Sequence, residues 1–153
     1  MNKKFFLGAL ALVMLAGCGN ANTGVDEEGA AASDAPATAD AKTTSAEIEE
    51  DGATTKAEVT KEGDKVTAVS IDVIDEEGLS KKDLGDDYGM KAASTIEKEW
   101  YEQVEFLENY ILENGVDSIK MTDDGKAENE DLKSGCTISI KTMVDAVKEA
   151  EAK

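Results

Sequence analysis

The sequence predicts an α+β fold, in which one long and one short helix pack on a small antiparallel sheet. Three patterns predict it. Apolar and polar residues alternate along 55–73, apolar residues recur every three or four positions over 96–111, and a shorter stretch with helical spacing follows at 142–150. A chain of 153 residues is expected to hold one domain. We place that domain at 52–153, which is long enough for one modest core.

The beginning of the chain has the features of a secretory signal. Lys3 and Lys4 precede an apolar run at 5–16, which is shorter than the roughly 20 residues of a membrane-spanning helix. The run leads into Leu-Ala-Gly-Cys at 15–18, which resembles the lipobox of bacterial lipoproteins. This resemblance implies a signal peptide over 1–17 and a diacylglycerol on Cys18. Two acyl chains are enough for stable anchoring, so we expect a protein held on the extracytoplasmic face of the cell membrane.

A linker is expected to follow the lipidated cysteine, over 18–51. This stretch is rich in Ala, Thr, Asp, Glu, Gly and Ser, and Val25 and Ile48 are its only large aliphatic residues. Such a composition buries too little apolar surface to offset the entropy of the chain, which predicts disorder. About 30 flexible residues have an r.m.s. reach of roughly 30 Å, so the domain would be tethered near the membrane without lying on it.

The charge of the chain excludes several classes of partner and chemistry. The net charge is −18, and removal of Lys3 and Lys4 with the signal would bring it to about −20 (−18 − 2). Such a surface repels nucleic acid and anionic headgroups, so we expect no nucleic-acid partner. The 16 basic residues are all lysine, and there is no histidine. The commonest general base and the commonest zinc ligand are therefore missing.

The first predicted element is a β-hairpin. Alternation along 55–60 predicts a strand, Glu-Gly-Asp at 62–64 predicts the turn, and alternation through Val73 predicts the returning strand. Val66 and Ala68 lie in the opposite phase from the rest of that strand, which predicts a bulge. A polar turn is expected at 75–78.

A long helix is predicted next. Ser94 and Glu97 have the spacing of a capping box, and Asn114-Gly115 has the residues of a helix end. One apolar stripe runs between them: Ile96, Trp100, Val104, Leu107 and Ile111. We interpret Trp100 as a core residue, and Tyr101 and Tyr110, beside the stripe, as candidates for lining a pocket.

The last third of the chain is predicted to hold a turn, a strand and a short helix. The acidic turn at 123–126 lacks the alternating ligand positions of a calcium loop, so we expect no metal. Alternation puts Cys136, Ile138 and Ile140 on a core-facing row, with Thr137 on the other face. Thr142 and Asp145 then cap the short helix. Without a histidine to activate it, Cys136 is expected to be a buried structural thiol.

The segment 131–137 resembles the flavinylation motif of the FMN-binding domain family. The motif reads Asp-Gly-x-Ser/Thr-Gly/Ala-Ala-Thr, and four positions match: Asp131, Ser134, Gly135 and Thr137. Leu132 and Cys136 stand where the family usually has Gly and Ala. In the family, a flavin transferase joins the phosphate of FMN to the hydroxyl of the last threonine. The resemblance therefore implies FMN attached at Thr137.

A second resemblance covers the loop before the long helix. Leu84–Lys91, together with Glu99–Gln103, looks like the glycine loop and following helix of FMN-binding lipoproteins from Gram-positive bacteria. It implies four further flavin contacts: close backbone approach at Gly85, soft ring contacts from Tyr88 and Met90, and a phosphate partner in Lys91. Such lipoproteins are extracellular electron carriers that accept electrons from a membrane quinone pool and pass them to external acceptors.

Two other functions stay open on the sequence alone. A flavin-free ligand-binding or interaction lipoprotein with the same fold is favoured by Leu132 and Cys136, the two departures from the motif. An enzyme that uses Cys136, or the adjacent acids at 76–77 or 86–87, is disfavoured by the lack of histidine. We therefore expect an electron-transfer flavoprotein and not a turnover enzyme.

Overall fold

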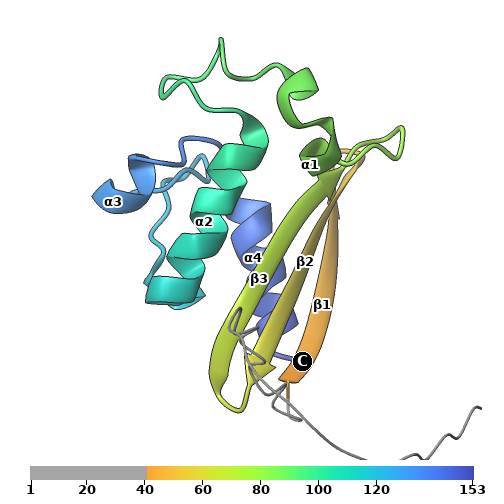
Figure 1. Cartoon of the computed structure of the whole chain (residues 1–153), viewed down its shortest axis with the longest axis vertical. Coiled ribbons are helices and arrows are strands. Elements are labelled where there is room, and N and C mark those ends of the chain that lie inside the picture. Colours follow the sequence, from red (N-terminus) through yellow and green to blue (C-terminus); the bar gives the residue numbers. More distant parts are fainter. Residues whose placement is uncertain (1–40) are drawn as a thin grey trace, which may run out of the picture. The chain divides into compact units, whose positions relative to one another are not determined.

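The computed structural model describes residues 41–153 and has an α+β fold (Figure 1). Its sheet has three antiparallel strands in the order β1-β2-β3, with β1 at Ala41–Glu50, β2 at Ala53–Glu62 and β3 at Lys65–Ile74. The helices follow: α1 Lys81–Leu84, the 3-10 turn η1 Gly85–Tyr88, α2 Trp100–Asn114, the 3-10 turn η2 Val116–Ser118, α3 Glu130–Lys133 and α4 Lys141–Glu151.

Strand β1 corrects the predicted linker, which was wrong for residues 41–50. β1 pairs with β2 along its whole length, from Ala41 opposite Glu62 to Glu50 opposite Ala53. Only Ala46 of this strand is fully buried. Main-chain hydrogen bonds to β2 therefore contribute more to holding β1 in place than apolar side chains do. Amino-acid composition does not indicate a strand of this kind. The predicted signal peptide, Cys18 and the rest of the linker lie outside the described residues.

The β2–β3 hairpin confirms both the predicted turn and the predicted bulge. Gly63 is in the turn with φ +61°. Thr60 pairs with Ala68 and Lys61 pairs with Val66, so Thr67 is the extra residue of the bulge. The bulge reverses the inward and outward faces of β3, as the change of phase in the sequence indicated.

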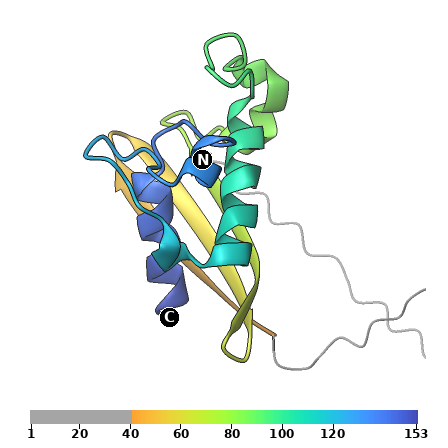
Figure 2. The ribbon, with the colours of Figure 1, turned by 90° about the vertical axis from the view of Figure 1, so that its left-hand side faces the viewer.

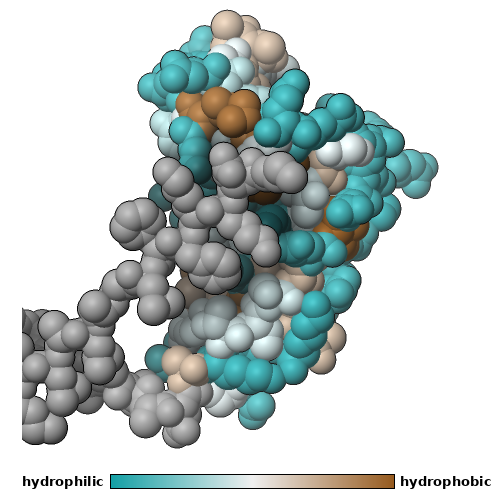
Figure 3. All heavy atoms as spheres, turned by 90° about the vertical axis from the view of Figure 1, so that its right-hand side faces the viewer, coloured by the Kyte–Doolittle hydropathy of each residue, from teal (hydrophilic) through white to brown (hydrophobic). Residues whose placement is uncertain are grey.

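The core lies between one face of the sheet and the helices α2 and α4 (Figure 2). Val59 and Ile71 from the sheet and Val144 and Val147 from α4 have no exposed surface. The opposite face of the sheet is polar, and the part of that side visible in Figure 3 is mainly hydrophilic. Within 41–153, no helix is long and apolar enough to cross a membrane.

The long helix begins five residues later than the sequence predicted. Glu99, not Ser94, is the N-cap of α2, and it forms a capping box with Glu102. Ser94 instead accepts main-chain hydrogen bonds from Ile96 and Lys98 within the preceding loop. The predicted end at Asn114-Gly115 is confirmed. Trp100 is only 3% exposed, which confirms it as a core residue.

The C-terminal part differs from the prediction in two ways. Helix α4 is present, but Thr142 does not cap it and donates its hydroxyl hydrogen bond to Glu50. Residues 136–140 alternate in burial as expected, with Cys136 and Ile140 fully buried, yet they form no strand beyond a single bridge between Ser139 and Lys126. The preceding Gly135 lies against Phe106 and Thr137 bonds to Gln103, so the segment packs on α2 and does not join the sheet.

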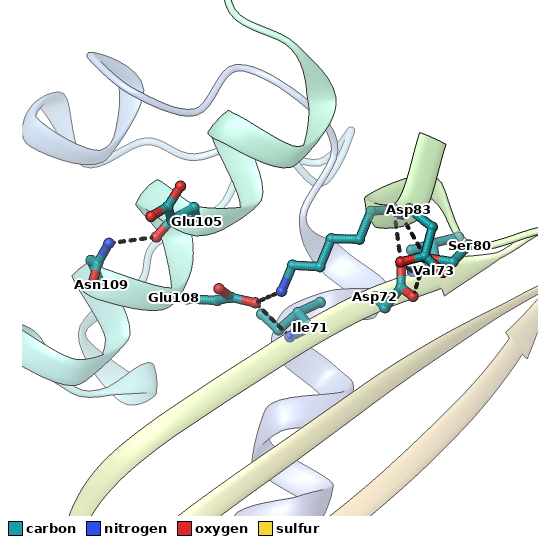
Figure 4. A network of polar contacts seen from close by, with 9 residues as sticks. Ile71, Asp72, Val73, Ser80, Asp83, Glu105, Glu108 and Asn109 are labelled. Atoms are coloured by element: carbon teal, nitrogen blue, oxygen red, sulfur yellow. Dashed lines mark hydrogen bonds and ion pairs between the residues drawn. The ribbon is translucent and has the colours of Figure 1, made fainter. Parts of the chain in front are cut away.

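The edge of β3 is bonded to side chains of the helical layer (Figure 4). Glu108 of α2 accepts hydrogen bonds from the Ile71 main-chain N–H and from Lys82 Nζ, both at 2.6 Å. Asp72 accepts from Ser80 Oγ at 2.6 Å and from the Lys82 main-chain N–H at 3.2 Å. The bond from the Ile71 N–H to Glu108 uses a donor on the β3 edge that could otherwise pair with another strand.

Candidate functional site

A pocket of about 360 Å³ lies where the loop before α2 meets the segment after α3. Its lining includes Met90 and Ser94 from the loop, Gln103 from α2, and Thr137 and Ile138 from the C-terminal segment. A volume of this size is at the lower end of the range for small-molecule sites, about 300–1,000 Å³. The structure therefore brings together two residues that the sequence proposed for flavin binding, Met90 and Thr137.

Thr137 also borders a second hollow. This hollow has a volume of about 310 Å³ and is lined by Ala127, Lys133 and Cys136 as well as by Lys126 and Thr137. Lys126 lines both hollows, its side chain is exposed, and it has no ion-pair partner within residues 41–153. Lys126 and Thr137 thus line the same two hollows, and Asp124 also lines the second one.

Gln103 connects the two sides of the pocket. Its Oε1 accepts hydrogen bonds from the Thr137 main-chain N–H at 2.9 Å and from Thr137 Oγ1 at 3.2 Å. Its Nε2 faces the loop, where it donates to the Lys98 carbonyl at 3.2 Å and to Ser94 Oγ at 3.3 Å, and lies 3.7 Å from Met90 Sδ.

Glu99 holds the loop that precedes α2. Its carboxylate is 4% exposed and accepts hydrogen bonds from the main-chain N–H groups of Met90 at 2.8 Å and Lys91 at 3.0 Å. Glu97, in the same loop, has φ +52°, a left-handed conformation that is uncommon outside glycine. The side-chain contacts of Glu99 and Gln103 therefore hold a loop whose own backbone has no regular structure.

Three of the proposed flavin contacts do not line the Thr137 pocket. Tyr88 packs against Trp100, with ring centroids 6.4 Å apart, and under Lys81 Nζ at 5.5 Å. Gly85 ends α1 with φ +50°, so it serves a turn in the chain. Lys91 lines a different hollow of about 490 Å³, together with Glu97 and Glu99. Gly85 and Tyr88 belong to the 3-10 turn η1 and not to the predicted glycine loop, whereas Lys91 lies in the loop that follows it.

The other residues of the motif build the turn that presents Thr137. Ser134 Oγ donates to the Asp131 carbonyl at 2.6 Å, and Asp131 Oδ1 accepts from the Leu132 main-chain N–H at 3.0 Å. Gly135 lies against Phe106, where an added Cβ would come within 2.3 Å of the ring. Leu132 has no exposed surface, so it fills the core at a position where the family usually has glycine.

Cys136 is a buried thiol, as predicted. Burial raises its pKa to about 11, although a hydrogen bond from the Ile138 main chain and the charge of Lys98 oppose the shift. At neutral pH the group is a neutral thiol, which is a poor nucleophile. Among residues 41–153, no three acidic or cysteine side chains are grouped so that they could hold a metal ion.

Neither tyrosine of α2 lines the pocket, so that prediction was wrong. Tyr110 is 8% exposed and accepts a hydrogen bond from Asn129 Nδ2 at 3.1 Å. Tyr101 donates to Asp86 at 3.2 Å, and this bond raises the pKa of Tyr101.

Sequence reasoning missed Gln103, Ser94 and Lys126 as pocket residues. One signal pointed to Gln103. It follows Trp100 by three positions, which puts an uncharged polar side chain on the apolar face of the helix. A buried amide needs hydrogen-bond partners from elsewhere in the fold, so its place in the stripe indicated a polar contact inside the molecule.

Comparison with known proteins gives one similar structure. No protein-family model matches the sequence, and no curated protein matches it. A solution NMR structure of a structural-genomics target from Clostridium thermocellum is similar to this chain, with a TM-score of 0.48 and 26% identity, covering 71% of this chain and 86% of that one.

Proposed function

We propose that this protein is a lipid-anchored FMN protein of the FMN-binding domain type, on the extracytoplasmic face of the cell membrane. It carries FMN covalently on Thr137, receives electrons from a quinone-linked donor in the membrane and passes them to external acceptors. The observation that carries the proposal is the half-buried Thr137 hydroxyl, which lies in one pocket with Met90 and Lys126.

Electrostatics supports a phosphate at this position. A phosphodiester adds one negative charge to a chain whose net charge is already −18, so it needs a local cation. Lys126 can supply one, because it is exposed, lines the same pocket as Thr137 and has no ion-pair partner within the described part of the chain. Lys126 therefore takes the role that the sequence gave to Lys91.

The pocket wall supports a flat, partly apolar ring. Met90 has a flexible, polarisable thioether that packs well against aromatic systems, and Ile138 adds aliphatic surface. Six of the nine lining residues are polar, among them Gln103, Ser94 and Thr95, so the apolar surface is confined to Met90, Ala93 and Ile138. The apolar part suits the ring, and the polar residues offer hydrogen-bonding groups that fix the orientation of a ligand.

Attachment is a substitution at phosphorus that the chain does not perform alone. The Thr137 oxygen forms a bond to the FMN phosphorus of an activated flavin nucleotide, the bond from that phosphorus to the departing nucleotide breaks, and the hydroxyl proton is lost. The chain has no histidine to accept this proton, so a flavin transferase supplies the base. When bound, the flavin supplies the redox chemistry, and the protein holds it and tunes it.

The test is the intact mass of the full-length protein, exported by cells that also express a flavin transferase and purified from their membranes in detergent. Wild type is compared with Thr137→Ala, with Thr142→Ala as the matched control, since Thr142 is also half-buried but lies on α4. We expect one FMN group and yellow colour in wild type and Thr142→Ala, and neither in Thr137→Ala.

An unmodified, colourless wild-type protein would contradict the proposal. The flavin-free interaction lipoprotein would then be the better account, because Leu132 and Cys136 depart from the motif and are both buried core residues.

A further inference from the structure

Gln103 is a buried polar residue, and all the hydrogen-bonding groups of its side chain bond to residues around the pocket. Its side chain has no exposed surface. Both acceptor positions of Oε1 are used by one residue, Thr137, through its main-chain N–H and its hydroxyl. The amide hydrogens are directed to the opposite wall, toward Lys98 and Ser94.

The orientation of the Gln103 amide follows from its neighbours. A main-chain N–H can only donate, so the atom facing Thr137 N must be the oxygen. A carbonyl can only accept, so the atom facing the Lys98 oxygen must be the nitrogen. An amide oxygen in turn only accepts, and the Thr137 hydroxyl must therefore donate its hydrogen to Gln103.

This arrangement sets the direction in which Thr137 can react. An amide oxygen is too weak a base to take the hydroxyl proton, so Gln103 holds Thr137 in place before the reaction, and the hydroxyl hydrogen turns from Gln103 to the base of the transferase as the oxygen attacks phosphorus. We propose that Gln103 is a positioning residue for flavin attachment, which orients the Thr137 oxygen toward an incoming phosphorus and ties it to the Met90–Lys98 loop. The inference rests on the function proposed above.

The link to the loop gives the same side chain a second effect. The loop carries Met90, which we assign to the ring, and the C-terminal segment carries Thr137, which we assign to the phosphate. These segments are far apart in the sequence, and Gln103 touches both. One side chain therefore fixes the distance between the attachment point and the surface that receives the ring.

The test measures the rate at which a purified flavin transferase adds FMN to the full-length protein in detergent, in a flavin-free state. Gln103→Met has a similar length and no acceptor, and we expect its rate to fall about 10- to 100-fold, as misplacement of a reacting group does. Gln103→Glu keeps an acceptor toward Thr137 and loses the donors toward Lys98. We expect its rate to fall less than that of Gln103→Met, by about threefold to tenfold, because the contact with Thr137 is retained while the link to the loop is lost.

A second readout does not depend on the transferase. Hydrogen exchange at the Thr137 amide, resolved by fragmentation mass spectrometry, is expected to be slow in wild type and Gln103→Glu and fast in Gln103→Met. Tyr110→Phe is the matched control. It removes a buried hydrogen-bond acceptor two turns along the same helix and leaves the Thr137 contacts in place, so both readouts should match wild type.

Several results overturn the inference. One is a Gln103→Met protein that melts cooperatively and takes up FMN at the wild-type rate. Another is a Thr137 amide that exchanges its hydrogen in the wild-type protein as fast as in an unfolded peptide. The second measurement decides the matter if Gln103→Met does not fold. A wild-type protein that takes no FMN but protects the Thr137 amide would contradict the proposed function while retaining the hydrogen-bond geometry.

Discussion

The sheet layer and the pocket layer of this molecule are held together by different forces. In the sheet layer, β1–β3 and α4 meet through aliphatic side chains such as Ile71 and Val147, which have no exposed surface. In the pocket layer, Glu99 and Gln103 are buried and bind main-chain groups of segments without regular structure. Apolar burial is non-directional, whereas hydrogen bonds fix positions and angles.

This difference indicates what each layer requires of its sequence. Several aliphatic residues of similar volume satisfy a core position. A contact such as that between Glu99 and the Met90 N–H requires a particular atom at a particular place. A pocket made of loops gains defined geometry from such contacts, and it becomes sensitive to single changes that leave the sheet intact.

The largest expected effect tests the apolar layer. Ile71→Ala should lower the free energy of unfolding by about 2–5 kcal/mol, because it leaves a cavity in a fully buried site. Chemical denaturation measures this loss. If the two layers are independent, FMN addition at Thr137 should proceed at the wild-type rate well below the melting temperature. A large drop in that rate would show that the layers are coupled.

The next effect concerns Cys136, directly before Thr137 in the chain. Its pKa is raised from 9.0 to about 11, so the folded state keeps the thiol proton more tightly than the unfolded state does. The resulting stability is present below pH 9 and is lost as pH rises from 9 to 11. The loss should reach about 2–3 kcal/mol, at about 1.4 kcal/mol per pH unit.

Denaturation of wild type and Cys136→Ala across this pH range isolates the thiol, because lysines and tyrosines titrate in both proteins. Identical pH profiles would contradict the burial of this thiol.

Glu99→Ala tests the polar layer. The change removes the acceptor of two loop N–H groups and the cap of α2, so we expect a loss of about 1–3 kcal/mol. Hydrogen exchange should quicken at Met90 and Lys91 while the amides of β2 keep their protection. Glu113→Ala, at an exposed position of the same helix, should change neither. Equal acceleration across the sheet would mean that the loop and the sheet open as one unit.

The smallest effect is expected on the outer face of the sheet. Lys56 and Glu47 form an ion pair of 3.0 Å whose side chains are about half exposed. Exposed pairs contribute roughly 0–1 kcal/mol, so Lys56→Ala should shift the denaturation midpoint only slightly. A loss well above this range would show that the pair holds β1 to β2.

The sheet layer was more predictable than the pocket layer for the same physical reason. Alternation identified the β2–β3 hairpin and its bulge, because side-chain direction along a strand depends on local sequence. The strand β1 was missed, since its stability comes from pairing with β2 and its composition is that of a linker.

In the pocket layer, the sequence pointed to Thr137 and Met90 but misplaced Tyr88 and Lys91. Lys91 is placed by the bond of its main-chain N–H to Glu99, which begins a helix that the sequence placed five residues earlier, and Tyr88 is placed by its packing on Trp100. Long-range bonds of this kind leave no periodic signal.

The close packing of Gly135 on Phe106 affects which positions of the 131–137 motif can change during evolution. A side chain at Gly135 would collide with the ring, and Leu132 and Cys136 fill the core, so the fold alone maintains these three positions. A descendant without the proposed cofactor would still keep them. The hydroxyl of Thr137 is under no comparable steric demand, so its loss would be the first mark of a lineage that no longer carries flavin.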